Sequence, residues 1–334
     1  MPAGVCSETW ILDHPQTLIA LQRAYLAAGS EIIYAPTFGA NRVLLGHHDL
    51  QREVQALNRD LVQLGREAVG TSALLAGDMT TTGQPVTPGD DSAYETLLEI
   101  YREQAEALLE AGVDLFAVET MMGVTECMAA IEAIRSLCET PILCTLSVYS
   151  DGKCYFDGSA EEAAELLPGL GADAVGLNCS SGPDQMGTVV RMMKKAAPDT
   201  PIAAKPNAGL PTITETGEAV YHMDPEDFAR HMRALKQDGA SLLGGCCGTG
   251  CVYRSAPRTA LSGFLSAQLF AQEVPHLRGR HSERKAEFAV EHLLGHAPAA
   301  QLGRVDAPAA GSLAVLLGMK RLAQAQKRNA VMPG

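Results

Sequence analysis

Short apolar runs recur along the chain, and each is followed by a longer segment in which apolar residues return at every third or fourth position. The short runs predict β-strands because they are brief and rich in β-branched residues, and the longer segments predict amphipathic helices. Seven strands are expected, at residues 31–38, 73–79, 114–120, 141–148, 173–179, 201–207 and 241–246. The clearest helices are expected at residues 15–29, 91–112 and 224–239, and each of them ends at a glycine, a common helix stop.

The alternation of these elements predicts an α/β fold with a parallel sheet covered by helices, because strands that are apolar throughout are buried on both faces. A (β/α)8 TIM-type barrel fits better than a doubly wound sheet, since chemically distinctive residues recur at the carboxyl ends of strands, where barrels build their sites. These residues are Glu119, Cys179, Asn207, Cys246 and Cys247. The chain opens with a helix and yields seven strands, so we expect a barrel that lacks its first strand.

The pattern also divides the chain into two parts. Residues 1–271 are expected to form the barrel. Beyond them the pattern weakens into a mixture of charge, proline and alanine, followed by a candidate helix at residues 312–329. We interpret residues 272–334 as a C-terminal appendage that is partly helical or flexible, with a partly disordered linker as the alternative.

Composition narrows the classes of partner. The 334 residues are 46% hydrophobic and 19% charged, which is typical of a soluble globular protein. The formal net charge of −13 would repel phosphates, so we expect no nucleic-acid partner and no general attraction to anionic lipid. No run approaches the ~20 apolar residues of a membrane span, and the N-terminus lacks the layout of a secretory signal. These features predict a cytoplasmic protein that acts on small molecules or proteins.

Cysteines at strand ends are the strongest chemical signal. Cys179 ends "GLNC", and Cys246 and Cys247 lie in "GGCCGTG". Because such loops share one rim of a barrel, we expect the three thiols to bind Zn²⁺ with one open position, and the glycines permit the kink that adjacent ligands need. The alternative is that cysteines pack as small hydrophobes, which we assign to three others. These are Cys127, Cys138 and Cys144.

A zinc ion on three thiolates favours another sulfur at its open position. It lowers the pKa of an incoming thiol, which then binds as a thiolate at neutral pH and remains nucleophilic. The predicted chemistry is therefore thiol activation. Hydrolytic zinc sites are usually rich in histidine, and a closed structural site would need a fourth cysteine.

Six segments resemble the homocysteine S-methyltransferase family, and more closely the homocysteine-binding module of cobalamin-dependent methionine synthases. In order, they are "AGSEIIYAPTFGAN", "AGDMTTTGQPVTP", "GVDLFAVETMMGVTECMAAI", "VGLNCSSGP", "AKPNAGLP" and "GGCCGT", and the resemblance covers about residues 8–270. It implies a (β/α)8 barrel with Zn²⁺ on Cys179, Cys246 and Cys247. It also implies a methyltransferase that activates homocysteine as a thiolate and converts it to methionine.

The resemblance further implies the residues that contact the substrate. Glu119 would bind the ammonium group of homocysteine. Asn207 would place an oxygen near the metal, with a simple turn residue as the alternative. Thr37, Phe38 and Asn41 would shape the substrate rim, or would form no more than a tight connection between a strand and a helix.

The segment "PNAGLP" resembles the corrinoid-linked branch of the family, which implies a methylcobalamin-carrying partner protein as methyl donor. The chain has no Asp-x-His-x-x-Gly segment of the kind that binds cobalamin. Two alternatives stay open. The donor could be S-methylmethionine or betaine, or the chain could be a docking subunit that binds zinc and thiols without catalysis.

The chain departs from the family pattern at two places. The family's first strand, with its Asp-Gly-Gly/Ala-Met-Gly-Thr segment, has no counterpart before Trp10, which predicts either a translation start upstream of Met1 or closure of the barrel by residues 312–319. After the paired cysteines, "GTGCVY" replaces the family's usual Thr-Pro. Cys251 is therefore a candidate for the open zinc position, with an inert loop thiol as the alternative.

Overall fold

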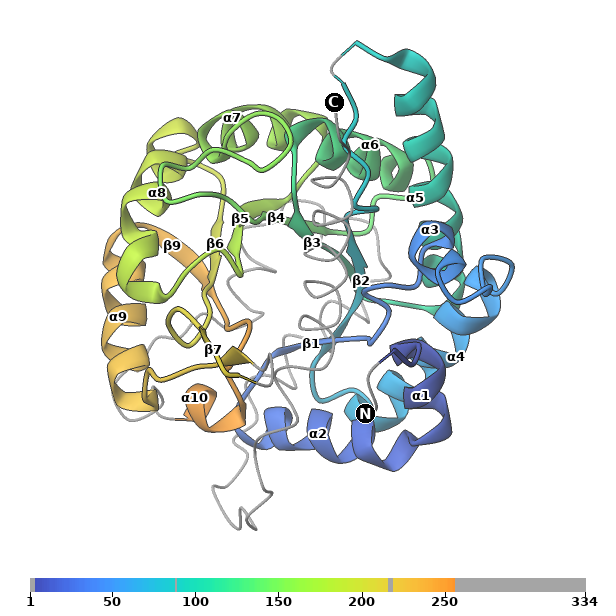
Figure 1. The fold of residues 1–334 in the computed structure, drawn as a ribbon, viewed down its shortest axis with the longest axis horizontal. Helices are drawn as coiled ribbons and strands as arrows, with labels where there is room; N and C mark the ends of the chain where they lie inside the picture. The colour runs from blue at the N-terminus through green and yellow to red at the C-terminus, as the bar shows by residue number, and fades with distance from the viewer. Residues whose placement is uncertain (1–3, 88, 216–218, 256–334) are drawn as a thin grey trace.

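A computed structural model describes residues 4–87, 89–215 and 219–255, and Figure 1 looks into the curved sheet that they form. Seven parallel strands pair in the order β1-β2-β3-β4-β5-β6-β9. Their bounds are β1 Ile32–Tyr34, β2 Leu74–Thr80, β3 Leu115–Met121, β4 Ile142–Leu146, β5 Ala174–Asn178, β6 Ile202–Lys205 and β9 Ala240–Leu243. Each strand overlaps one of the seven predicted positions, so the predicted strands are confirmed.

The sheet curls without closing. In the described part of the chain, β1 and β9 are the two edge strands and do not pair with each other. The helix α2 (Pro15–Ala27) lies outside this gap beside α10 (Cys251–Ser255) (Figure 1). The hydroxyl of Tyr25 in α2 donates to the carbonyl oxygen of Thr249, 3.1 Å away, which ties the two sides of the gap together. The described residues thus form a (β/α)8-type barrel that lacks one strand, as expected.

The remaining described helices lie around the outside of the sheet (Figure 1). They are α1 Ser7–Asp13, α3 Arg42–Gly46, α4 Val54–Val69, α5 Asp91–Ala111, α6 Val124–Arg135, α7 Ala160–Leu170, α8 Pro183–Ala196 and α9 Pro225–Gln237. The predicted helices correspond to α2, α5 and α9. The α5 helix begins where the side chain of Asp90 accepts from the backbone N–H of Ala93, and it ends at Gly112, whose φ of +84° suits glycine.

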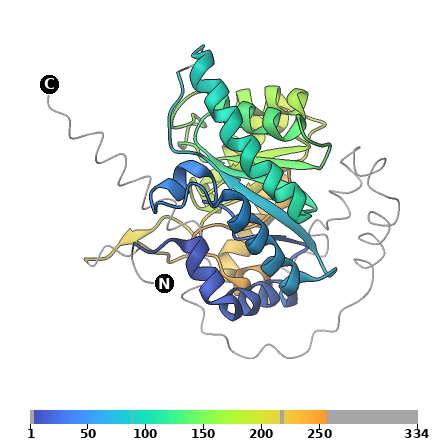
Figure 2. The same ribbon diagram turned by 90° about the vertical axis from the view of Figure 1, so that its right-hand side faces the viewer.

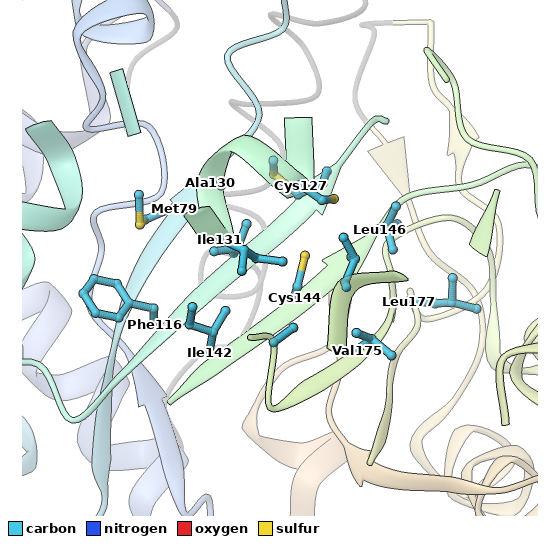
Figure 3. Close-up of a cluster of buried hydrophobic side chains, with 14 of the residues drawn as sticks. Met79, Phe116, Cys127, Ala130, Ile131, Ile142, Cys144, Leu146, Val175 and Leu177 are labelled. Atoms are coloured by element: carbon cyan, nitrogen blue, oxygen red, sulfur yellow. The ribbon is translucent and has the colours of Figure 1, made fainter. Parts of the chain in front are cut away.

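The main core lies between the outer face of the sheet and the helices, where Phe116 of β3 packs near Ile131 of α6 (Figure 3). Full burial of such a side chain contributes about 1.5–3 kcal/mol. Cys127 and Cys144 are fully buried in this core, which confirms that they act as small hydrophobes. Cys138, which follows α6, is half-buried and packs against the core's edge.

The inner face of the sheet carries mostly small side chains. A second buried cluster there is made of Ala76, Leu115, Ala117, Leu143, Ala174 and Ala203. A Cβ atom on Gly176 would lie 2.2 Å from the carbonyl oxygen of Ala203, so only glycine fits where β5 meets β6. The small residues allow the sheet to curl tightly and leave the polar groups of the strand ends facing one another.

A short antiparallel hairpin, β7 (Thr212–Ile213) with β8 (Ala219–Val220), interrupts the alternation between β6 and α9. It projects from the body of the fold (Figure 2), and the strand prediction did not include it.

The predicted appendage at residues 272–334 and the proposed closing segment at 312–319 lie outside the described residues. Within the described residues, no helix is both long enough and apolar enough to cross a membrane.

Candidate metal centre

Three cysteine thiols meet at the carboxyl end of the sheet. Cys179 directly follows β5, while Cys246 and Cys247 lie in the loop after β9. The Sγ atoms of Cys179 and Cys247 are 3.5 Å apart, and all three sulfur atoms lie within 4.8 Å of one another. All three residues are buried. The fold therefore brings together two loops that are far apart in sequence, because their strands are separated in the sheet only by β6.

The cluster fits a zinc ion in both chemistry and spacing. Two sulfurs bound to one tetrahedral zinc ion at about 2.3 Å are about 3.8 Å apart, close to the observed separation of Cys179 and Cys247. No other group of three or more histidine, cysteine or acidic ligands comes this close together in the described ranges. Cys251, at the start of α10, does not belong to the group.

The three thiols also differ in pKa, because they hydrogen-bond one another. Hydrogen bonds from Cys179 and then Cys246 lower the pKa of Cys247 to about 4. Hydrogen bonding to Cys246 and Cys247 raises the pKa of Cys179 well above its usual value. The cluster thus resembles one thiolate held by two thiol donors, and this negative charge favours a cation.

The loop that carries the paired cysteines depends on its glycines, as the sequence indicated. A Cβ atom on Gly245 would lie 2.3 Å from the Oγ1 of Thr249, whose hydroxyl donates to the carbonyl oxygen of Cys246 at 2.7 Å. Gly248 has a φ of +78°, and a Cβ atom there would lie 2.4 Å from the ring of Tyr221. Both positions therefore exclude a side chain, and the kink that turns both thiols toward Cys179 requires glycine.

Asn207 connects the two cysteine loops. Its Nδ2 donates to the carbonyl oxygen of Cys179, and its Oδ1 accepts from the backbone N–H of Cys247 at 3.0 Å. The backbone N–H of Cys246 donates to the carbonyl oxygen of Pro206 at 2.8 Å. The structure places Asn207 beside the thiols, where its amide sets the spacing between them.

Asn178, which directly precedes the first cysteine, is a fully buried hub. Its Oδ1 accepts from the backbone N–H of Thr120 at 2.9 Å and from the hydroxyl of Thr145 at 2.8 Å. Its Nδ2 donates to the Oγ1 of Thr120 at 2.7 Å and to the Sγ of Cys246 at 3.8 Å. Thr120 has a φ of +57°, which is strained for a β-branched residue, so the Asn178 amide also holds an unfavourable backbone in place.

Glu119 lies on the inner face at the end of β3, 7% exposed. Its Oε2 forms an ion pair with the ammonium group of Lys205 on β6. Lys205 also donates to the hydroxyl of Tyr34 at 2.9 Å. Although burial lowers it, the pKa of Lys205 is raised above its usual value by the Glu119 carboxylate. The carboxylate that the sequence singled out therefore already has a cationic partner.

The residues expected at the substrate rim lie in the connection between β1 and α3. The hydroxyl of Thr37 donates to the carbonyl oxygen of Asp78 at 2.9 Å, and Phe38 is buried. Asn41 caps α3, because its Oδ1 accepts from the N–H groups of Val43 and Leu44. These contacts account for a tight strand-to-helix connection, and substrate contact by Thr37, Phe38 and Asn41 stays a prediction.

Sequence reasoning missed several residues around the thiols. They are Asn178, Tyr221, Asp78 and Lys205, together with Tyr34, which contacts Lys205. Lys205 carried a usable signal, since a single lysine ends an apolar strand directly before "PN", and so did Asp78 in "AGDM". Tyr221 follows the hairpin, packs against the three thiols and hydrogen-bonds Cys247. Nothing in its local pattern placed it there.

Asp78→Asn is expected to stabilise the metal-free protein at neutral pH and to change it little near pH 4. Burial, reinforced by repulsion from Glu119, raises the pKa of Asp78 well above 3.8. A carboxyl group with a raised pKa stabilises the fold while it keeps its proton, and this contribution is lost as pH rises from the unfolded value through the folded one. Urea unfolding in EDTA at pH 4.5 and 7.5 measures the difference. An equal gain at both pH values would contradict the assignment.

Comparison with known proteins gives a consistent family. A family model described as homocysteine S-methyltransferase matches residues 3–253. The methionine synthases of Mycobacterium leprae and Mycobacterium tuberculosis are each 28% identical over 256 residues, which is 73% of this chain and 21% of theirs. The chain therefore spans about a fifth of the length of these curated relatives.

Solved structures agree at the level of the fold. The homocysteine methyltransferase MmuM from Escherichia coli in its oxidised form has a TM-score of 0.64 at 18% identity, covering 76% of this chain and 87% of that one. Its metallated form has a TM-score of 0.62 at 21% identity, covering 77% and 90%. At such low identity these matches establish a shared fold and nothing finer.

Proposed function

The chain belongs to the homocysteine S-methyltransferase family, and from that premise we propose that it is a zinc-dependent enzyme that methylates homocysteine to methionine. The observation that carries the proposal is the buried cluster of Cys179, Cys246 and Cys247 at the strand ends. Three thiolates would hold the ion, and zinc bound there would lower the pKa of the substrate thiol.

The chain's own residues prepare this site. Asn207 holds the two cysteine loops at a fixed spacing, and Asn178 donates to the Sγ of Cys246. Such a donor orients a ligand sulfur and tunes its charge. Tyr221 packs against the thiols and hydrogen-bonds Cys247. In the reaction, the homocysteine thiol gives up its proton and its sulfur bonds to the methyl carbon. The bond from that carbon to the donor breaks, and its electron pair stays on the donor.

Substrate contacts follow from position. Glu119 lies on the inner face near the thiols, and we assign it to the ammonium group of homocysteine. Asn207 lies close enough to the cluster to place its oxygen beside the reacting sulfur. Thr37, Phe38 and Asn41 complete the rim from the β1–α3 connection.

For the methyl donor we propose a separate corrinoid protein that carries methylcobalamin. The curated relatives named methionine synthase support this choice, as does the segment "PNAGLP". The alternative donors are S-methylmethionine and betaine. A further alternative is a docking subunit that binds zinc and a thiol without turnover.

A donor assay tests the proposal. The purified full chain, loaded with zinc, is incubated with homocysteine and one donor at a time, and methionine is quantified by mass spectrometry. We expect methionine from methylcobalamin and none above background from S-methylmethionine or betaine. Turnover with an onium donor alone would overturn the corrinoid assignment, and zinc and homocysteine binding without turnover by any donor would favour the docking subunit.

A further inference from the structure

Three buried ionisable groups face the interior of the curled sheet, each within electrostatic range of Cys246 in the cysteine cluster. Asp78 of β2, Glu119 of β3 and Lys205 of β6 are 3%, 7% and 8% exposed. The inner face below them is lined by alanine and leucine side chains. Burying charged groups on such a surface is unfavourable unless each finds a partner, so the way these three groups are satisfied is informative.

Lys205 has a donor to spare. An ammonium group has three N–H donors. In the described residues, two of them are accounted for by Glu119 and by the hydroxyl of Tyr34. The third donor is available to an acceptor from outside the protein. The same lysine acts electrostatically on Cys246, which places its charge within range of the thiols.

Asp78 has an acceptor oxygen without a donor, which complements the spare donor of Lys205. Its Oδ1 is buried and has no hydrogen-bond partner among the described residues. The backbone of Asp78 is fixed on both sides, because its N–H donates to the Oγ1 of Thr37 and its carbonyl oxygen accepts from the same hydroxyl. The orphaned oxygen is therefore held in position without a donor to meet it, which is a costly arrangement unless a ligand supplies one.

One free cationic donor, one orphaned carboxyl oxygen and three thiols together match the three functional groups of an amino-acid thiol. We propose that Lys205 binds the carboxylate of the acceptor and that Asp78, together with Glu119, binds its ammonium group. Glu119 keeps one oxygen on Lys205 and shares the ammonium group with Asp78. This inference rests on the proposed function and adds to it two residues, Lys205 and Asp78, that would select the amino-acid end of the acceptor.

The test compares three thiols that differ only in the groups in question: homocysteine, 3-aminopropane-1-thiol, which lacks the carboxylate, and 4-sulfanylbutanoate, which lacks the amine. Dissociation constants are measured by calorimetry on the zinc-loaded full chain. For the wild type, each analogue is expected to bind about 10- to 100-fold more weakly than homocysteine, since each loses a hydrogen bond to a charged group.

Two variants then separate the roles. Lys205→Met is expected to weaken homocysteine and 4-sulfanylbutanoate by about tenfold or more without weakening 3-aminopropane-1-thiol. Asp78→Asn is expected to weaken the two amine-bearing thiols and to leave 4-sulfanylbutanoate unchanged. Lys195→Met, at an exposed lysine of α8, serves as the matched control and should change none of the three constants.

The outcomes distinguish this inference from the proposed function. Equal affinity of the wild type for homocysteine and 3-aminopropane-1-thiol would overturn the role of Lys205, whether or not the variants fold. Equal affinity for homocysteine and 4-sulfanylbutanoate would overturn the role of Asp78. Weaker binding of only the two amine-bearing thiols in Lys205→Met would show that Lys205 does no more than hold Glu119 in place. A uniform loss for all three thiols would show that Lys205 supports the metal centre and does not bind the carboxylate. Either result would overturn its proposed role. Failure of the zinc-loaded wild type to bind any of the thiols would overturn the proposed function and this inference with it.

Discussion

Cys247→Ser is expected to lower the rate of homocysteine methylation by about 1000-fold or more, because losing the activating metal removes several kcal/mol of stabilisation from the reacting sulfur. Cys247 is central to the cluster, since its Sγ lies 3.5 Å from that of Cys179 and it has the lowest pKa of the three. A serine hydroxyl is a poor zinc ligand at neutral pH. Methionine formation, measured together with zinc content, checks the expectation.

The matched control is Cys138→Ser, which changes a half-buried thiol after α6 outside the cluster. It should retain both zinc and activity. Cys247→Ser itself should keep its fold, because the backbone N–H of residue 247 can still donate to the Oδ1 of Asn207. Circular dichroism can verify this. Full activity in Cys247→Ser would refute the three-cysteine site.

Asn178→Ala is expected to destabilise the protein by about 2–4 kcal/mol and to weaken zinc binding by about 10- to 100-fold. The substitution leaves the N–H of Thr120 and the hydroxyl of Thr145 buried without their acceptor. It also removes the amide that donates to the Sγ of Cys246. Urea unfolding of the metal-free protein gives the first effect, and competition with a zinc chelator gives the second.

Asn58 supplies the control for this prediction. It is also fully buried, and its Nδ2 donates to the carbonyl oxygens of Ala40 and Val54 at 2.8 and 2.7 Å. Asn58→Ala should therefore cost a similar amount of stability with no change in zinc affinity. If both variants weakened zinc equally, or neither did, Asn178 would be a structural residue with no particular role at the metal centre.

The strand pattern was predictable because buried parallel strands leave a simple record in sequence. Runs such as "DLFAVET" are apolar on both faces, and the structure places Phe116 against the helices and Ala117 on the inner face. The seven strands of the described sheet were predictable for the same reason, since the sequence shows seven such runs. The hairpin at β7 and β8 was not, because strands of two residues are too short to show periodicity.

The site was only partly predictable. Cys179, Cys246 and Cys247 stand at or just after strand ends, and glycines flank the adjacent pair. Barrel geometry brings such strand ends together. The ion-pair partner of Glu119 could not be predicted from the sequence pattern. Lys205 meets it across the interior from another strand, and such pairing depends on how far the sheet curls. The orphaned oxygen of Asp78 likewise appears only once every neighbouring donor has been placed.

The central claim is that three cysteines hold a zinc ion that activates homocysteine, and calorimetry with zinc analysis on the wild type and Cys246→Ser tests it most directly. The account predicts one zinc per wild-type chain and homocysteine binding accompanied by proton release. Both should be lost in Cys246→Ser. Homocysteine binding of equal strength in the variant, or in zinc-free wild type, would contradict the account.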